Sequence, residues 1–580
     1  MGGTVLKTPT FVELKKNLKK DFSSLPVIRL GIIGDCATQH IALSLRGWGY
    51  EKGINFDIFD SDYNQIDAQT MDPASELYEF SPAYTAVINC TEKLYMRFCE
   101  TPLDMRSSFA ATICDSMVSV WSRISENCRS RIIQFNFPVW DDRVFGDFGG
   151  KTTDSFVFQT RKLNMLLAEK AGEYKNVFIC DIEGIQSRVG EKALRDSKMF
   201  CIAKMPFRTD ILPLVARTVT DTVLAAEGKI KKCVVLDLDN TLWGGVVGDD
   251  GTDGIQIGEL GSGHAFTQFQ HWLKELKNRG IILCVCSKNN EENAKDPFIN
   301  HPEMVLRLED ISVFVANWED KASNIRYIRD VLNIGMDSMV FLDDNPFERE
   351  AVRSLVPEIT VPELPENPED YVDYLRNEDL FGTASYSKED RMRTDQYRAE
   401  AERVSLQSKC NDYDDYLMSL EMVAEANPFD AYHFPRIAQL TQRSNQFNLR
   451  TVRYTEQEIE DIASDDKYIT IYFTLKDKFG DHGLISAVIM EKREDALFVN
   501  TYLMSCRVLK RGMEEFIINT MVETAKNNGY KKVIGEYLPT AKNAMVAGIY
   551  EKLGFTRVND NIFTAEVESF EYNKTHIRKG

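Results

Sequence analysis

Short apolar runs alternate with amphipathic, helix-like stretches along the first 225 residues. The strand-like runs are residues 27–33, 56–59, 85–89, 131–135 and 177–181. Alternation of strands with helical patterns predicts a parallel sheet, in which functional residues gather at the carboxyl ends of the strands. The pattern therefore predicts an α/β domain over residues 1–225.

A second alternation begins after Gly228. It predicts strands at residues 233–238, 281–286 and 338–342 and helices at 264–279 and 321–332. A proline-rich stretch, 356–368, ends this unit. We therefore expect a multidomain α/β protein with domains at 1–225 and 228–365, a charged helical connector at 366–410 and a mixed α+β domain at 411–580.

Composition limits the class of protein further. A chain of 580 residues is too long for one hydrophobic core, and its net charge of −20 argues against nucleic acid or an anionic membrane as the main partner. No apolar stretch approaches a membrane span, and the amino-terminal residues lack the apolar core of a secretory signal. The 12 cysteines form no C-x-x-C pair, which indicates buried thiols in a reducing compartment, so we expect a cytoplasmic protein.

Polar residues that suit phosphoryl transfer follow several predicted strands in the middle domain. Asp237 and Asp239 end the strand at 233–238, a pair that by itself can simply close a strand. Ser287 follows the next strand, and Lys321 begins a helix. Asp343 and Asp344 follow the third strand and offer the oxygen ligands that magnesium prefers. The ordered set resembles the haloacid-dehalogenase (HAD) phosphatase superfamily.

That resemblance implies roles for these residues. Asp237 would be the nucleophile and Asp239 the general acid and base, while Ser287 and Lys321 would hold the phosphoryl oxygens. Asp237, Asp239 through its carbonyl, and Asp343 would bind Mg²⁺, and Asp344 would be a further magnesium contact or a helix N-cap before Pro346. Thr241 and Asn289 are expected to bind the substrate. The interval between Asp239 and Ser287 holds a glycine-rich flap (244–263) and one helix, so no large cap is expected.

The carboxy-terminal domain carries a different signature. Its sequence Tyr550-Glu-Lys-Leu-Gly-Phe555 resembles the GNAT N-acetyltransferases, and Arg507-x-x-Lys510-x-Gly512 partly matches their pyrophosphate loop, with Lys510 where glycine is usual. Cys506 precedes this loop, as either a buried strand cysteine or a reactive thiolate near a helix start. His482 would serve as its base or contact the acyl group, or be a satisfied turn histidine. Arg507 and Asn543 are expected to bind substrate.

The order of the domains along the chain resembles that of the FkbH-like family. The resemblance is carried by sequence segments such as residues 203–207, 341–350, 443–449 and 504–508. The resemblance implies a phosphatase coupled to glyceryl transfer, with 1,3-bisphosphoglycerate as the substrate. Cys506 would form a glyceryl thioester and pass it to the phosphopantetheine arm of an acyl carrier protein. The alternative is a phosphatase acting on another phosphorylated metabolite, with a non-catalytic GNAT-like domain that binds substrate or partner.

The amino-terminal domain resembles SGNH hydrolases. Gly34-Asp35-Cys36 stands where Gly-Asp-Ser would supply the nucleophile, and the chain lacks a late Asp-x-x-His to complete a triad. Asn136 would line the same pocket. We therefore expect a docking or lid module in preference to an esterase.

Overall fold

The computed structural model describes residues 9–386 and 412–580. Two compact units divide the chain, one over residues 7–225 and the other over residues 226–580. The carboxy-terminal unit contains two separate sheets. The connector predicted at 366–410 lies largely outside the described residues, and the finer domain limits stay predictions.

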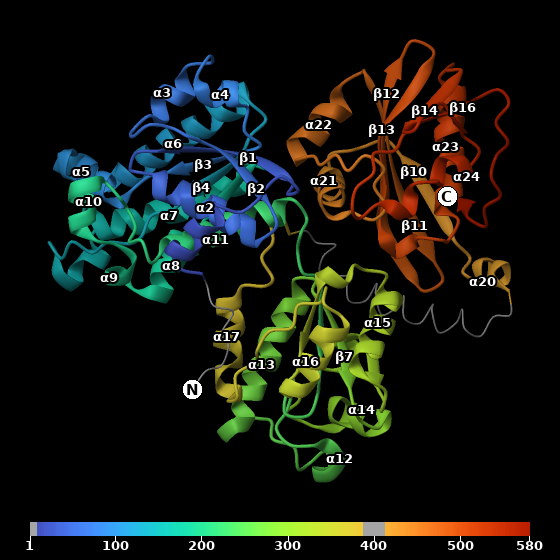
Figure 1. Cartoon of the computed structure of the whole chain (residues 1–580), viewed down its shortest axis with the longest axis horizontal. Helices are drawn as coiled ribbons and strands as arrows, with labels where there is room; N and C mark the ends of the chain where they lie inside the picture. Colours follow the sequence, from blue (N-terminus) through green and yellow to red (C-terminus); the bar gives the residue numbers. More distant parts are fainter. Residues whose placement is uncertain (1–8, 387–411) are drawn as a thin grey trace. The chain divides into compact units, whose positions relative to one another are not determined.

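The amino-terminal unit is built on a five-stranded parallel sheet in the order β2-β1-β3-β4-β5 (Figure 1). This order is that of flavodoxin-like doubly wound folds. The strands are β1 (Val27–Gly34), β2 (Asn55–Asp60), β3 (Tyr84–Ile88), β4 (Arg131–Phe135) and β5 (Val177–Cys180). The helices are α1 (Phe11–Asn17), α2 (Gln39–Glu51), α3 (Ile66–Met71), α4 (Glu76–Phe80), α5 (Thr91–Glu100), α6 (Phe109–Asn127), α7 (Phe156–Glu173), α8 (Ile182–Val189), α9 (Glu191–Leu194), α10 (Ser197–Ala203) and α11 (Leu212–Ala226).

A second parallel sheet, in the order β8-β7-β6-β9, forms the middle of the chain. Its strands are β6 (Cys233–Leu236), β7 (Ile282–Ser287), β8 (Ile311–Ala316) and β9 (Met339–Leu342). Its helices are α12 (Val247–Asp250), α13 (Gly261–Asn278), α14 (Glu291–Asn300), α15 (Lys321–Leu332), α16 (Pro346–Leu355) and α17 (Tyr371–Glu378). The sequence pattern missed β8, an edge strand, although its buried run with several β-branched residues is typical of a strand.

The last part of the chain is an eight-stranded sheet in the order β15-β16-β14-β13-β12-β11-β10-β17. Most neighbouring strands are antiparallel, whereas β13 and β14, and β10 and β17, run parallel, so this is an α+β domain. The strands are β10 (Val423–Asn427), β11 (Tyr468–Asp477), β12 (Gly480–Arg493), β13 (Ala496–Met504), β14 (Lys532–Glu536), β15 (Thr556–Arg557), β16 (Ile562–Glu566) and β17 (Arg578–Lys579). The helices are α20 (Tyr413–Ser419), α21 (Phe434–Arg443), α22 (Glu456–Ser464), α23 (Met513–Asn527) and α24 (Ile549–Lys552).

Strand β6 shows why each strand of the middle sheet is a continuous apolar run in the sequence. Val234 and Leu236 point into one buried cluster, and Cys233 and Val235 point into another on the opposite face. A parallel sheet with helices on both faces buries both sides of its strands, which removes the polar alternation. This buried strand holds its flanking polar residues at fixed positions on the two edges of the sheet.

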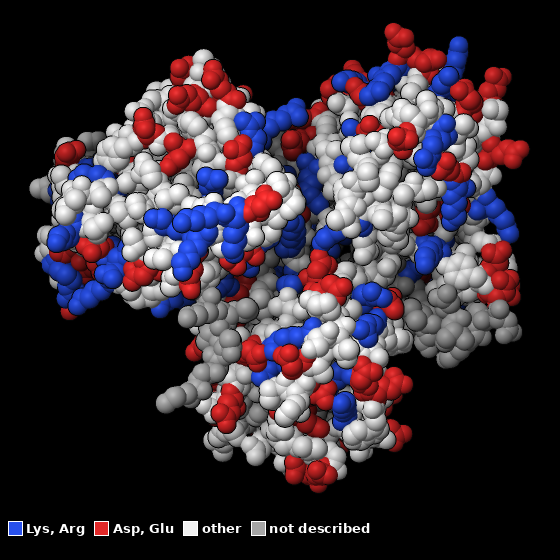
Figure 2. Space-filling model, in the orientation of Figure 1, with Lys and Arg blue, Asp and Glu red and all other residues white. Residues whose placement is uncertain are grey.

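On the face seen in Figure 2, acidic and basic side chains are interspersed over each part, so neither sign gathers into one large patch on that face. Among the described helices, none combines the length and apolar character needed to cross a bilayer.

Candidate active site

The carboxyl edge of the middle sheet brings together residues that are far apart in the sequence. Asp237 follows β6 and extends its ladder, because its N–H donates to the Leu342 carbonyl at 3.0 Å. Ser287 is the buried last residue of β7, and Asp343 directly follows β9. Parallel strands end at the same edge, so these side chains converge there.

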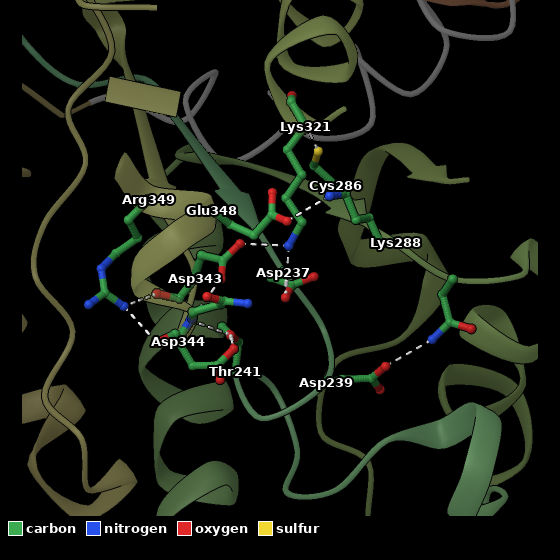
Figure 3. A network of polar contacts seen from close by, with 12 residues as sticks. Asp237, Asp239, Thr241, Cys286, Lys288, Lys321, Asp343, Asp344, Glu348 and Arg349 are labelled. Carbon is green, nitrogen blue, oxygen red and sulfur yellow. Dashed lines mark hydrogen bonds and ion pairs between the residues drawn. The ribbon is translucent and has the colours of Figure 1, made fainter. Parts of the chain in front are cut away.

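Lys321 joins the two carboxylates. It is the first residue of α15, whose N-cap is Asp320, and it is only 4% exposed. Its Nζ lies 2.9 Å from Asp237 Oδ2 and 2.6 Å from Asp343 Oδ2 (Figure 3). Burial alone would lower the pKa of Lys321, but the two carboxylates outweigh it and raise the pKa, so the ammonium stays charged.

Asp237, Asp343 and Asp344 form a carboxylate cluster in which one oxygen of each lies within 4.8 Å of the others. Asp237 Oδ1 is buried and has no hydrogen-bond partner within the described residues. Burial and the charge of Asp237 raise the pKa of Asp343 to about 6, against the opposing effect of Lys321. An unused buried oxygen and an excess of carboxylates are what a hard divalent cation would satisfy, so the cluster fits Mg²⁺.

The loop that carries Asp343 and Asp344 is fixed from two sides. Arg349 Nη1 donates to the carbonyls of Asp343 and Asp344, at 2.8 and 2.7 Å (Figure 3). Thr241 Oγ1 lies 3.2 Å from Asp344 Oδ1 and accepts the Asp344 N–H at 3.1 Å. Thr241 therefore supports the carboxylate loop. The N-cap of α16 is Asn345, which rules out the helix-cap alternative for Asp344.

Asp239 points away from this cluster. Its Oδ1 accepts from the Trp243 indole at 2.9 Å and from the Val247 N–H at 3.0 Å, and its Oδ2 accepts from Asn289 Nδ2 at 3.0 Å. Burial raises the pKa of Asp239 despite these bonds, which favours its protonated form. Asn289 is thus placed beside Asp239, where it orients the carboxyl group.

Within the described residues, no cap domain covers the mouth of the site. Between β6 and β7 the chain supplies only the short α12 and the helix α13. Trp318, in the loop before α15, is 77% exposed, and Phe347, at the start of α16, is 85% exposed. The carboxyl edge therefore presents large apolar side chains to solvent beside the carboxylates.

In the carboxy-terminal domain, the predicted site residues lie in different surroundings. His482 is buried on β12, with its Nε2 3.0 Å from Asp477 Oδ2 and 3.3 Å from Arg511 Nη1. Asn543 is buried and holds a loop, because its Nδ2 donates to the carbonyls of Asn448 and Leu538, each at 2.9 Å. The side chain of Arg507 lies outside the described residues.

Cys506 lies in a one-turn 3₁₀ helix after β13, and α23 begins only at Met513, so the cysteine is not at that helix's amino terminus. Its carbonyl accepts from Asn333 Nδ2 at 2.6 Å, and its side chain packs against both the carboxy-terminal core and one core of the middle sheet. Cys506 also lines a cavity of about 90 Å³.

In the amino-terminal unit, the residues predicted for an esterase-like pocket lie in different surroundings. Cys36 is buried, and a hydrogen bond with Cys90, together with burial, raises its pKa, which keeps it a thiol. Asp35 accepts from the Cys90 N–H at 2.8 Å and borders a cavity of about 350 Å³. Asn136 does not line that cavity, since its Oδ1 accepts the Ile182 N–H at the start of α8.

One family model and several solved structures are similar to parts of this chain. A family model described as FkbH, N-terminal domain, matches residues 29–224. The crystal structure of the N-terminal part of BF1531 from Bacteroides fragilis, containing a phosphatase domain complexed with Mg, is 47% identical; the match covers 65% of this chain and 100% of that one, with a TM-score of 0.62. The ribosomal-protein-S18-alanine N-acetyltransferase from Escherichia coli is 14% identical over 25% of this chain and 94% of its own, with a TM-score of 0.21. A search of curated proteins found no match.

The parallel sheet with Asp237, Lys321 and Asp343 at its carboxyl edge defines a phosphatase domain of the HAD type. Three features narrow the class of protein further: the phosphatase domain is capless, it has a flavodoxin-like neighbour, and an α+β domain follows it. The chain belongs to the FkbH-like family.

Proposed function

We propose that this protein is a Mg²⁺-dependent phosphatase coupled to acyl transfer, which removes phosphate from a 1,3-bisphosphoglycerate-like donor and loads the glyceryl group onto an acyl carrier protein. The observation that carries the phosphatase part is the pairing of Lys321 with Asp237 and Asp343. Asp237, Asp343 and Asp344 would hold the Mg²⁺ named for the Bacteroides relative, which would neutralise phosphate charge.

In the phosphatase reaction, Asp237 attacks phosphorus and becomes an aspartyl-phosphate, while the bond to the leaving oxygen breaks. Asp239 gives its proton to that oxygen and then takes one from the attacking water. Its raised pKa suits the acid step, and its bonds to Trp243 and Asn289 hold the carboxyl group beside the nucleophile's strand end. Lys321 and Ser287 bind the phosphoryl oxygens.

In the acyl-transfer reaction, the Cys506 thiolate attacks the carbonyl carbon of the acyl phosphate. The carbon–oxygen bond to phosphate breaks, and the leaving phosphate takes up the proton that the Cys506 thiol gave up on forming the thiolate. A pantetheine thiol then takes the acyl group. Support comes from the position of Cys506 in a cavity, with its backbone held by Asn333.

The test is to incubate the full chain with Mg²⁺ and freshly generated 1,3-bisphosphoglycerate and to map adducts by peptide mass. Phosphate release and an acyl adduct on Cys506 are expected. Asp237→Asn should abolish phosphate release from the phosphate monoester and leave the adduct. Phosphate release with no adduct on any cysteine would refute the thioester mechanism.

One observation favours a second function, a phosphatase for another metabolite with a non-catalytic carboxy-terminal domain. Of the predicted site residues in this domain, His482 and Asn543 are both buried in contacts with protein groups. Cys506 is then the remaining candidate for a reactive side chain. Under this alternative, Cys506→Ala would retain full turnover of the physiological donor.

A further inference from the structure

The amino-terminal unit has a cavity of about 350 Å³ at the carboxyl edge of its sheet. Asp35, which directly follows β1, and Asn89, which directly follows β3, both line this cavity. After β2 the chain returns to the other side of β1, so the strand order reverses between β1 and β3. Doubly wound folds bind their ligands at such a reversal, and the volume is within the range of ligand pockets.

Apolar side chains form the walls of this cavity. They come from β3, α5 and α6 and all belong to one buried core cluster: Val87, Leu94, Ile113, Met117 and Val120. Packing in that cluster fixes the shape of the walls. The volume holds about ten to twelve atoms other than hydrogen, if each takes roughly the 30 Å³ that a water molecule takes in the liquid. A ligand that fills the cavity therefore has a compact apolar body of that size.

The base of the cavity is a connected chain of polar groups. The Trp121 indole donates to Gln134 Oε1 at 2.9 Å, and Gln134 Nε2 donates to Asn89 Oδ1 at 3.3 Å. Asn89 Nδ2 donates to Asp35 Oδ2 at 3.3 Å, and the Cys90 N–H donates to Asp35 Oδ1 at 2.8 Å. Burial raises the pKa of Asp35 against the opposing effect of these bonds. The base therefore suits an uncharged polar group of a ligand better than an anionic one.

The mouth of the cavity carries the opposite character. Lys93 and Arg97 lie one helical turn apart on α5, and both line the cavity. Lys93 Nζ donates to the Asn64 side-chain oxygen at 2.6 Å, and within residues 9–386 and 412–580 neither cation forms an ion pair with a carboxylate. The acidic side chain nearby, Asp67, is already paired with Arg123 at 3.1 Å. The mouth therefore has two cations that can receive the anionic group of a ligand.

The side chains of this cavity favour binding over hydrolysis. Cys36, at the position of an SGNH nucleophile, does not line the cavity, and no histidine is among its described lining residues. The hydroxyl of Ser116, which does line it, donates to the Ile113 carbonyl of its own helix at 2.8 Å. A ligand here is therefore held by contacts with the walls, the base and the mouth.

We propose that this cavity binds a small monocarboxylate whose apolar body carries a hydroxyl or carbonyl group at the far end. The carboxylate pairs with Lys93 and Arg97 at the mouth, and the uncharged polar group bonds with Asp35 and Asn89 at the base. Such a ligand is larger and less polar than the three-carbon donor of the proposed function. The cavity is thus a second ligand site, and its occupation does not depend on chemistry at Asp237 or Cys506.

Calorimetric titration of the full-length protein with 8-hydroxyoctanoate, its amide and octanoate tests the proposal. The hydroxy acid should bind at one site, about tenfold or more tightly than the amide, which lacks the charge, and about threefold or more tightly than octanoate, which leaves Asp35 and Asn89 without a partner. Arg97→Met should weaken binding of the hydroxy acid by about threefold to tenfold and leave the amide within about twofold. Arg46→Met is the matched control, because Arg46 is also an exposed helical arginine, on α2, and does not line the cavity.

A second pair of variants tests the location. Ser116→Trp should abolish binding, because an indole at this lining position fills the mouth. Ser119→Trp is its control, since Ser119 is also exposed on α6 but does not line the cavity, and it should bind as the wild type does. Equal affinity for the acid and the amide, unchanged binding in Ser116→Trp, or no saturable binding up to about 1 mM would each overturn the proposal. Each of these results leaves the adduct test on Cys506 untouched, so the two proposals fail separately.

Discussion

Replacement of Lys321 by methionine removes one charge from the centre with little change in volume. In the wild type, Nζ lies within 2.9 Å of both Asp237 and Asp343, and all three side chains are buried. Loss of one partner from a buried ion pair costs about 3–5 kcal/mol, because the remaining charges lose their compensation. The variant leaves two carboxylates facing each other without that compensation.

The cost should depend on pH and on Mg²⁺. The pKa of Asp343 is already about 6, and loss of Lys321 raises it further, so the carboxyl can take up a proton at low pH. We therefore expect the full cost near pH 8 and a smaller one at pH 5, and saturating Mg²⁺ should restore much of the stability at pH 8. Phosphatase activity should stay at least about 100-fold lower, because the charge that binds the phosphoryl oxygens is gone.

Hydrogen exchange of peptides from β6 and β9 is the suitable assay, since a chain with several domains has no single unfolding free energy. Opening of these strands without Mg²⁺ should become about 100-fold or more easier at pH 8. Lys288→Met is the control: Lys288 is 40% exposed and pairs with Glu348, so its loss should change exchange by less than about 1 kcal/mol. Unchanged exchange in Lys321→Met at pH 8 would refute the electrostatic argument.

Three further predictions follow from the same site. Asp239→Asn should lower turnover by about 10²- to 10⁴-fold with little effect on Mg²⁺ affinity, since the Asp239 carboxyl group points away from the metal cluster. Rapid-quench kinetics measures turnover, and calorimetric titration measures Mg²⁺ affinity. A matching loss of Mg²⁺ affinity would contradict this placement of Asp239. The raised pKa of Asp343 lets the native state bind more protons than the unfolded state between about pH 4 and 6, so the metal-free protein should lose stability as pH rises through that window. Because protons compete with the metal, Mg²⁺ affinity should fall about tenfold per pH unit below pH 6. An Mg²⁺ affinity that is the same from pH 7 to pH 5 would contradict this prediction. Arg349→Met should weaken Mg²⁺ binding by about 10- to 100-fold, because it frees the loop of Asp343 and Asp344, and an unchanged titration would show that the loop holds itself.

The sequence was most informative about functional residues that directly follow a strand. Asp237, Ser287 and Asp343 were each predicted at the carboxyl end of a strand, and each lies there in the structure. The start of the predicted helix at Lys321 coincides with that of α15. Strand β8 was not predicted because no candidate catalytic residue directly follows it; Lys321 comes only at the start of the next helix.

Side-chain direction and domain packing were not readable from the sequence. Two residues apart on one turn, Asp237 faces Lys321 while Asp239 faces Trp243, a split that depends on the backbone of the turn. Nor does any local pattern around Cys506 indicate that it packs beside the amino end of β6. That contact depends on which surfaces of two folded domains are complementary, which a single sequence does not display.

Strand β6 also limits how this family can vary in length. Lys232 and Asp237 flank its four residues; Lys232 lines the cavity beside Cys506, and Asp237 belongs to the carboxylate cluster. Insertion or deletion of one residue would turn every following side chain to the opposite face of the sheet and move the carboxylate out of the centre. Length variation among relatives should therefore be absent from this strand and concentrated in the flap at 244–263, where the chain is not part of the sheet.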